Sequence, residues 1–268
     1  MPKRGRDAAS VAPTVLLPLC NGTVYPGDEL CRLSALPNEF SLLVGVGVVR
    51  EGVDVLRSSR VGVLRFEASA SKIWVESDVR RYVPAVGEHV IGIVESRHAD
   101  EYRLHIGGAA SAALPVLAFD GATKRNRPHL EVGALVYCRI TVAHRDMEPE
   151  VTCASPPGVG AKDWVTRESI FGELQGGQVF DCPPLLCRRL MGLDETAPVL
   201  DALGGLASFE LAVGANGRVW LSSSSAAMVV LAQAAILRSQ GVADEDHGRL
   251  VEELAASFDI APNTEQAA

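Results

Sequence analysis

The chain has 268 residues, enough for two or three small domains, and carries 25 Lys and Arg against 33 Asp and Glu. The formal net charge of -8 excludes a general attraction to polyanions, so any nucleic-acid contact must come from a local group of cations. Aromatic residues make up 5% of the chain, which argues against binding of single strands mainly by base stacking. No apolar run approaches the roughly 18 residues of a membrane-spanning helix, so we expect no membrane contact.

The first residues need separate treatment because basic side chains precede an apolar segment, as in a signal peptide. Pro13 and Pro18 interrupt that segment, and no typical cleavage site follows. We therefore expect residues 1–10 to be a disordered basic tail and the protein to be intracellular.

Residues 11–80 alternate short apolar runs with turn signals such as Asn21-Gly22. Residues 42–49 and 72–76 have the composition of strands. This pattern predicts a small β-rich amino-terminal domain.

A second β section covers residues 81–154. Its apolar runs are short and regularly separated by turn residues, which favours a five-stranded closed barrel of the oligonucleotide-binding type. The expected strands are residues 88–94, 102–106, 112–118, 134–143 and 150–154.

A cluster of cationic residues interrupts this section between Gly121 and Pro128. Lys124, Arg125 and Arg127 place three positive charges in four residues, and the flanking Gly and Pro favour an exposed loop. The pattern is consistent with contacts to nucleic-acid phosphates, with a solvated loop, or with a contact to an acidic partner.

Residues 155–260 follow a different periodicity, which predicts an α+β domain before a frayed tail at 261–268. Helices are expected over 185–191, 197–203, 226–237 and 252–258, with strands over 208–213 and 218–221.

The strands at 208–213 and 218–221 flank the tetrapeptide Gly214-Ala215-Asn216-Gly217. Asn-Gly supplies the positive φ angles of a tight hairpin, so Gly214, Asn216 and Gly217 favour a structural turn. A weaker alternative is the GxxG loop with which K-homology domains clamp RNA, although that loop lies between two helices.

The sequence contains no convincing catalytic or metal site, and we expect no cofactor. Asp146, Glu148 and Glu150 are interrupted by Pro149, whereas a two-metal site needs carboxylates that converge from several elements. The six cysteines have no CxxC spacing, which favours reduced, mostly buried thiols over disulfides or a zinc site.

The middle section resembles an S1 domain, and the section after it resembles a K-homology (KH) domain. In this order behind a small β domain, the chain resembles the S1/KH cap subunits of the eukaryotic RNA exosome. The resemblance covers roughly residues 72–237, and its motifs lie at 81–84, 87–92, 121–128, 146–150 and 214–220.

This resemblance implies a non-catalytic subunit that binds RNA. In that family, three S1/KH proteins cap a ring of six RNase PH-like subunits, and RNA threads through the capped channel to a separate exoribonuclease. The implied partners are therefore RNA, the ring subunits and the other cap subunits. The implied processes are rRNA maturation and RNA turnover in the nucleus, the nucleolus and the cytoplasm.

Carried over by position, Lys124, Arg125 and Arg127 lie on the S1 loop offered to RNA, where Asn126 adds a neutral hydrogen bond. His105, on a predicted barrel strand, either faces RNA or is an ordinary surface histidine. A stand-alone S1/KH regulator of RNA is the alternative function, and an autonomous exoribonuclease is a third candidate.

Overall fold

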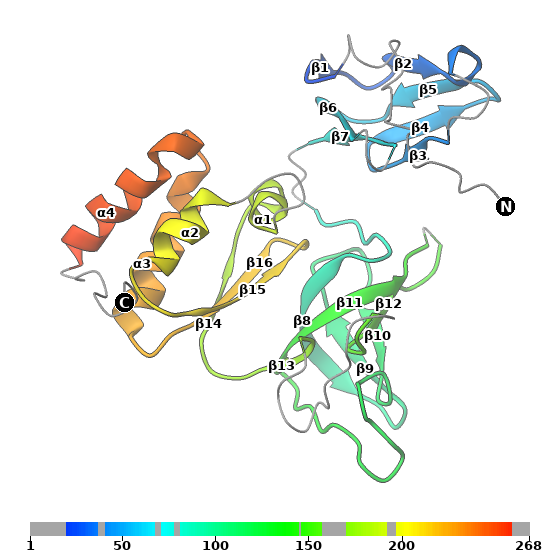
Figure 1. The fold of residues 1–268 in the computed structure, drawn as a ribbon. Coiled ribbons are helices and arrows are strands. Elements are labelled where there is room, and N and C mark those ends of the chain that lie inside the picture. Colours follow the sequence, from blue (N-terminus) through cyan, green and yellow to red (C-terminus); the bar gives the residue numbers. More distant parts are fainter. Residues whose placement is uncertain are drawn as a thin grey trace, which may run out of the picture. The chain divides into compact units, whose positions relative to one another are not determined.

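The computed structural model describes residues 20–36, 41–67, 71–77, 81–144, 146–156, 170–191 and 197–258. The tails expected at 1–10 and 261–268 lie outside these ranges. The chain divides into two compact units, residues 1–78 and 79–268, and each has its own hydrophobic core (Figure 1).

The first unit consists of two small sheets over one core. Its sheets have the strand orders β1-β6-β7-β3 and β2-β5-β4. Leu30, Leu56, Leu64 and Ile73 are fully buried between them. The elements are β1 (Thr23–Val24), β2 (Glu29–Arg32), η1 (Leu33–Ala35), β3 (Leu43–Val44), β4 (Val48–Glu51), β5 (Val55–Ser58), β6 (Gly62–Glu67) and β7 (Lys72–Glu76).

One strand expected in this unit is divided in the structure. The prediction of a strand over 72–76 is confirmed by β7, but the single strand over 42–49 is wrong, because β3 and β4 belong to different sheets. Gly47 causes the break: its φ of +83° is unsuited to a strand, and a Cβ there would lie 2.7 Å from the Val75 Cβ.

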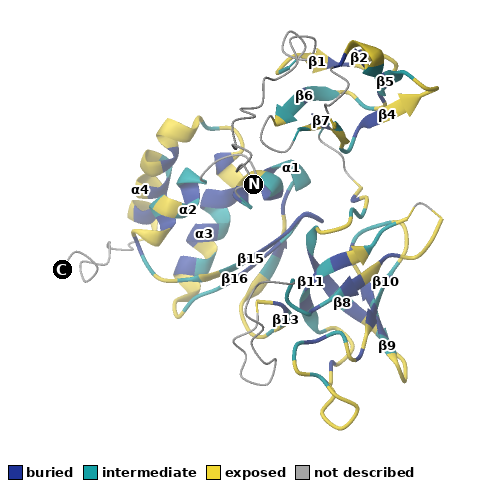
Figure 2. Cartoon of the chain, turned by 45° about the vertical axis from the view of Figure 1, so that its right-hand side comes forward, coloured by how far each residue is buried: buried dark blue, intermediate teal, exposed yellow. Residues whose placement is uncertain are grey.

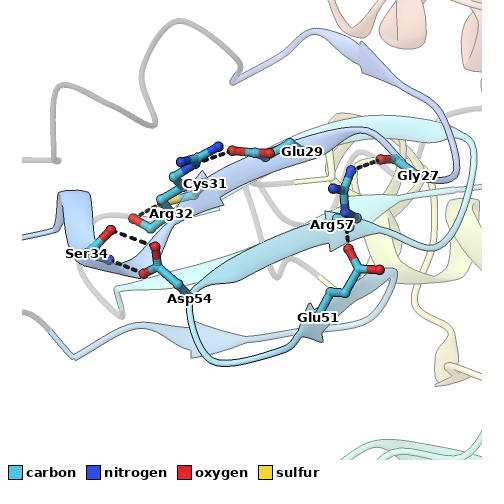
Figure 3. A network of polar contacts seen from close by, with 8 residues as sticks. All are labelled: Gly27, Glu29, Cys31, Arg32, Ser34, Glu51, Asp54 and Arg57. Carbon is cyan, nitrogen blue, oxygen red and sulfur yellow. Dashed lines mark hydrogen bonds and ion pairs between the residues drawn. The ribbon is translucent and has the colours of Figure 1, made fainter.

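Carboxylates neutralise arginines on the surface of the first unit (Figure 3). The Nε of Arg32 lies 2.7 Å from a carboxylate oxygen of Glu29. Arg57 pairs with Glu51 and also donates to the carbonyl oxygen of Gly27 at 2.7 Å. These arginines therefore present little uncompensated charge.

The second unit begins with the five-stranded barrel, which confirms the predicted S1-type fold. Its sheet runs β12-β10-β9-β8-β11, and the additional pairing of β11 with β12 closes it. Leu104, Val136 and Ile140 are fully buried at alternate strand positions, as the two-residue period of a strand requires. Figure 2 shows buried segments along the barrel strands, such as β8. The strands are β8 (His89–Arg97), β9 (Glu101–His105), β10 (Ala112–Pro115), β11 (Leu135–Val142) and β12 (Glu150–Thr152).

The KH part completes the second unit and confirms the predicted α+β fold. A three-stranded sheet, β14-β16-β15, shares one core with helices α1 to α4, while β13 adds an edge to the barrel sheet beside β11. The elements are β13 (Gly172–Leu174), β14 (Gln178–Asp181), α1 (Pro184–Leu190), α2 (Pro198–Gly204), β15 (Glu210–Gly214), β16 (Arg218–Ser222), α3 (Ala226–Ser239), η3 (Asp244–Asp246) and α4 (His247–Ser257).

Five of the six cysteines are buried, in agreement with the expectation of mostly buried thiols: Cys31, Cys138, Cys153, Cys182 and Cys187. Within the described ranges, no helix combines the length and the apolar character needed to cross a bilayer.

Candidate nucleic-acid interface

The cation-rich segment lies in the loop between β10 and β11, and this loop is anchored at both ends. At its start, the N–H of Val116 donates to the carbonyl of Asp100 at 3.0 Å. Towards its end, the hydroxyl of Tyr102 donates to the Pro128 carbonyl at 2.7 Å and accepts from the Leu130 N–H at 3.4 Å. The loop is therefore fastened to the hairpin formed by β8 and β9.

The tip of the loop is a tight turn with exposed side chains. The backbones of Thr123 and Asn126 exchange two hydrogen bonds, of 3.0 and 3.1 Å. Lys124, Arg125, Asn126 and Arg127 are all exposed, as the sequence predicts for a loop in this place.

The positive charges of this loop are not paired with carboxylates in the part of the chain that the structure describes. Among the ion pairs of these residues, none involves Lys124, Arg125 or Arg127. Arg127 instead donates from Nε to the Lys124 carbonyl at 3.2 Å and from Nη1 to the Ala99 carbonyl at 3.4 Å. The loop therefore keeps its full positive charge in an acidic protein, which suits contact with a polyanion.

Two further residues belong to this cationic surface and were not predicted from the sequence. Arg97, at the end of β8, is exposed, and its Nη1 lies 2.7 Å from Nε2 of the exposed His129. Each residue is unremarkable alone. One sequence signal could have pointed to Arg97. If the predicted strands at 88–94 and 102–106 form a hairpin, Arg97 lies at its turn, where side chains are exposed.

The structure does not bring His105 to the loop. His105 ends β9, whereas Tyr102, which anchors the loop, is near its start, about 10 Å away along the strand. The His105 ring is exposed, but its Nδ1 lies 2.7 Å from Nη2 of Arg218, which can only donate. His105 is therefore a neighbour of the KH part.

The turn at 214–217 lies against the barrel and contributes to the contact between the S1 and KH parts. Asn216 is buried, and its Nδ2 donates to the carbonyls of Ile91 and Ile106, both at 2.9 Å. Its Oδ1 accepts from the Ile91 N–H at 3.2 Å, so the amide is fully engaged within the protein. This placement corresponds to the structural turn and leaves no amide group for an RNA clamp.

Both glycines of this turn are required by close approach. A Cβ on Gly214 would lie 2.3 Å from the Asn216 Oδ1 and 2.9 Å from the backbone nitrogen of Ile91. Gly217 has a φ of +81°, and a Cβ there would lie 2.8 Å from the Cys182 carbonyl oxygen. Any side chain at either position would push the turn away from its partners.

Charged side chains reinforce the same contact. Arg218 donates to the carbonyl oxygens of Ile91 at 3.1 Å and His105 at 2.7 Å. Just before β8, Glu88 accepts a hydrogen bond from Arg188 of α1 at 3.1 Å. The S1 and KH parts are thus joined by direct hydrogen bonds at several points.

His89 belongs to the same junction. The Tyr137 hydroxyl donates to the Val213 carbonyl at 3.3 Å and lies 3.2 Å from Nδ1 of His89, which also packs edge-on against Phe171. Burial, and next the nearby Arg139 charge, lower the pKa of His89 below its ordinary value of 6.5. The junction therefore favours a neutral imidazole.

The carboxylates considered for metal binding do not converge. Glu148 pairs with Arg103, and the described residues include no group of three potential ligands that could hold a metal ion.

Comparisons with known proteins place these observations in a family. Residues 82–163 match the family described as exosome complex component RRP40, S1 domain, and residues 177–227 match a KH domain family. A Drosophila melanogaster protein named exosome complex component RRP40 is 36% identical over 225 residues, covering 83% of this chain and 92% of that protein. The chain belongs to the RRP40 family of exosome complex components.

Two other relatives show how widely this RRP40-type sequence is shared. The Schizosaccharomyces pombe exosome complex component rrp40 is 34% identical over 235 residues, covering 86% of this chain and 93% of the relative. The Homo sapiens exosome complex component RRP40 is 34% identical over 221 residues, covering 79% of this chain and 76% of the relative. The two family matches follow each other in the predicted order, with the S1 domain before the KH domain.

The buried amide of Asn216 yields a stability prediction. Asn216→Ala removes the side-chain partner of the Ile91 N–H and of the Ile106 carbonyl, while the Ile91 carbonyl keeps Arg218. This loss should destabilise the second unit by about 3 kcal/mol. The loss of stability is measured by urea unfolding followed by tryptophan fluorescence, to which the buried Trp220 contributes. Gln178→Ala, which removes an exposed hydrogen bond on the same sheet, should change stability by less than about 0.5 kcal/mol. Loss of RNA affinity at unchanged stability would contradict the structural role.

The lowered pKa of His89 yields a prediction for acid pH. As pH falls below 6.5, the unfolded chain takes up a proton that the folded state resists, so unfolding is favoured. The wild type should therefore lose stability between about pH 7 and pH 5 more steeply than His89→Gln. Urea midpoints at several pH values, compared between the two proteins, give the difference. Parallel curves would show that His89 does not contribute.

Proposed function

We propose that this chain is a non-catalytic RNA-binding cap subunit of the RNA exosome, which guides single-stranded RNA towards a separate 3′–5′ exoribonuclease. The observation that carries the proposal is an anchored loop in a member of the RRP40 family. The cations of this loop, Lys124, Arg125 and Arg127, form no ion pair with the other residues that the structure describes. The partners are RNA, the RNase PH-like ring subunits and the other S1/KH cap subunits. The processes are rRNA maturation and RNA turnover, in the nucleus, the nucleolus and the cytoplasm.

The charge distribution over the barrel favours the loop as the contact. Barrels of this type commonly bind nucleic acids on the face of their second and third strands, here β9 and β10. On that face Arg103 is paired with Glu101 at 3.0 Å and with Glu148. The large exposed apolar side chains of the described residues include no aromatic group on β9 or β10. The loop, in contrast, has exposed cations that form no ion pair with the described residues.

Binding through such a loop is expected to be weakly dependent on sequence. Lysine and arginine side chains on an exposed turn meet phosphates, and Asn126 can add a hydrogen bond to a phosphate or a 2′-hydroxyl. Such contacts suit a subunit past which many different RNAs must move.

The loop's contribution can be tested by removing its charges. Changing Lys124, Arg125 and Arg127 together to Ala should weaken binding of single-stranded RNA. The slope of log affinity against log salt should fall by about two, because each lost phosphate contact on a single strand contributes about 0.7. Fluorescence anisotropy over a range of salt concentrations measures both quantities.

A matched control removes three exposed or partly exposed arginines from the KH helices: Arg189, Arg238 and Arg249, all to Ala. It changes net charge equally, so its slope should stay close to that of the wild type. Equal losses in the two triple variants would show a general charge effect and contradict the loop's role.

Membership of a large assembly separates the proposal from a stand-alone regulator. The tagged chain should sediment from lysate with a large complex, and mass spectrometry of that fraction should find RNase PH-like subunits. Sedimentation as a free protein would favour the regulator. Degradation of RNA by the purified chain with Mg²⁺ would contradict the non-catalytic assignment.

A further inference from the structure

Arg97 is held in place by a side chain that carries no negative charge. Its Nη1 lies 2.7 Å from Nε2 and 3.3 Å from Nδ1 of His129. A guanidinium group has donors and no acceptor, so the imidazole ring can only act as the acceptor in this contact. Arg97 is thus oriented without losing its charge, and its remaining N–H groups stay available.

Arg127 is held in the same manner by backbone carbonyls. Its Nε donates to Lys124 and its Nη1 to Ala99. The two contacts with the neighbouring hairpin cross: Arg97 reaches from the β8–β9 hairpin to the loop, and Arg127 reaches from the loop to that hairpin. The two guanidinium groups therefore flank a single junction.

Several other arginines of the molecule are held by carboxylates. Arg65 pairs with Glu76 at 2.7 Å, and Arg103 pairs with Glu101 and Glu148. Paired arginines have little attraction left for an anion. Arginines oriented by neutral acceptors keep that attraction and lose less side-chain entropy when the anion binds.

We propose that Arg97 and Arg127 form a fixed two-arginine site for one backbone phosphate of single-stranded RNA, with His129 as the positioning residue of Arg97. The proposal rests on the proposed RNA-guiding function and adds a defined phosphate position to it. Lys124 and Arg125 differ in kind, because no side-chain hydrogen bond orients either of them within the described residues. Lys124 and Arg125 attract the RNA by charge alone, whereas Arg97 and Arg127 hold its phosphate in a defined position.

A phosphodiester suits this site because each of its two non-bridging oxygens accepts several hydrogen bonds. Two planar guanidinium groups on either side of a junction can then donate to one phosphate. The single-stranded backbone can also reach the junction between the β8–β9 hairpin and the loop, because both Arg97 and Arg127 are exposed. An acidic protein segment is the competing anion, and the experiment includes it.

The test uses the full chain, a short labelled single-stranded RNA and fluorescence anisotropy over a range of salt concentrations. Arg97→Ala should weaken binding about tenfold and lower the salt slope by about 0.7, one phosphate contact. His129→Ala should weaken binding severalfold with the salt slope unchanged, because Arg97 keeps its charge but loses its orientation. His129→Gln should restore affinity, because the amide oxygen can accept from Arg97.

Two comparisons make the result decisive. Arg249→Ala, which removes an exposed arginine of α4, should bind like the wild type. Lys124→Ala with Arg125→Ala reports on the proposed function alone. If that double variant weakens binding but Arg97→Ala and His129→Ala do not, the two-arginine site is overturned and the proposed function stands. If none of these variants weakens binding, RNA does not bind the β10–β11 loop or the adjacent hairpin. The two-arginine site and the proposed function of the loop are then both contradicted.

Polyglutamate serves as the competing anion. Displacement of RNA by polyglutamate at equal charge concentration would show that the site recognises acidic protein and would overturn the phosphate assignment. Circular dichroism confirms folding of each variant. If Arg97→Ala does not fold, Arg97→Lys replaces it, and this variant should keep the salt slope but lose affinity, because an ammonium group lacks the planar fork.

Discussion

The buried amide of Asn216 is the interaction on which the arrangement of the second unit depends. A single side chain satisfies backbone groups of Ile91 in β8 and Ile106 after β9, and it does so from a turn of the KH sheet. Burying a polar group is unfavourable unless its hydrogen bonds are made, so the turn has one acceptable position against the barrel. Gly214 and Gly217 make that position sterically accessible.

The proposed RNA contact of this acidic chain depends on where positive charge is left without a carboxylate partner. In the first unit and on the outer face of β9, arginines such as Arg57 and Arg103 are matched by carboxylates. At the junction of the β8–β9 hairpin with the following loop, the acceptors are carbonyls and an imidazole. Positive charge is therefore left unpaired among the described residues of this junction, although the formal net charge is -8. A count of charged residues does not reveal this difference.

The fold of the second unit was largely predictable, because alternation of apolar residues and turn signals are local properties. The five barrel strands and the hairpin around Asn216 follow from such patterns. The burial of Asn216 was not predictable, because its partners lie more than a hundred residues away. Helix α4 begins at His247, before the expected residue 252, since the acidic η3 turn leads directly into it.

The cationic site was predictable only in part for the same reason. Lys124 to Arg127 form a contiguous signal, whereas Arg97 joins them through a contact between segments 32 residues apart. The break between β3 and β4 was missed because the glycines at 45 and 47 were assigned to a strand. Their positions against Trp74 and Val75 depend on sheet packing and not on local composition.

The hydroxyl of Tyr102 has a mechanical consequence. It grips the loop at Pro128 and Leu130 while its ring is buried in the barrel core. In the proposed function, RNA that moves past the loop would exert a force on the side chains at its tip. The hydrogen bonds of Tyr102 would transmit that force to β9. The barrel wall, continuous through hydrogen bonds with its neighbours, would then resist the force as a whole. A loop held in this manner can bear traction without swinging away from the moving strand.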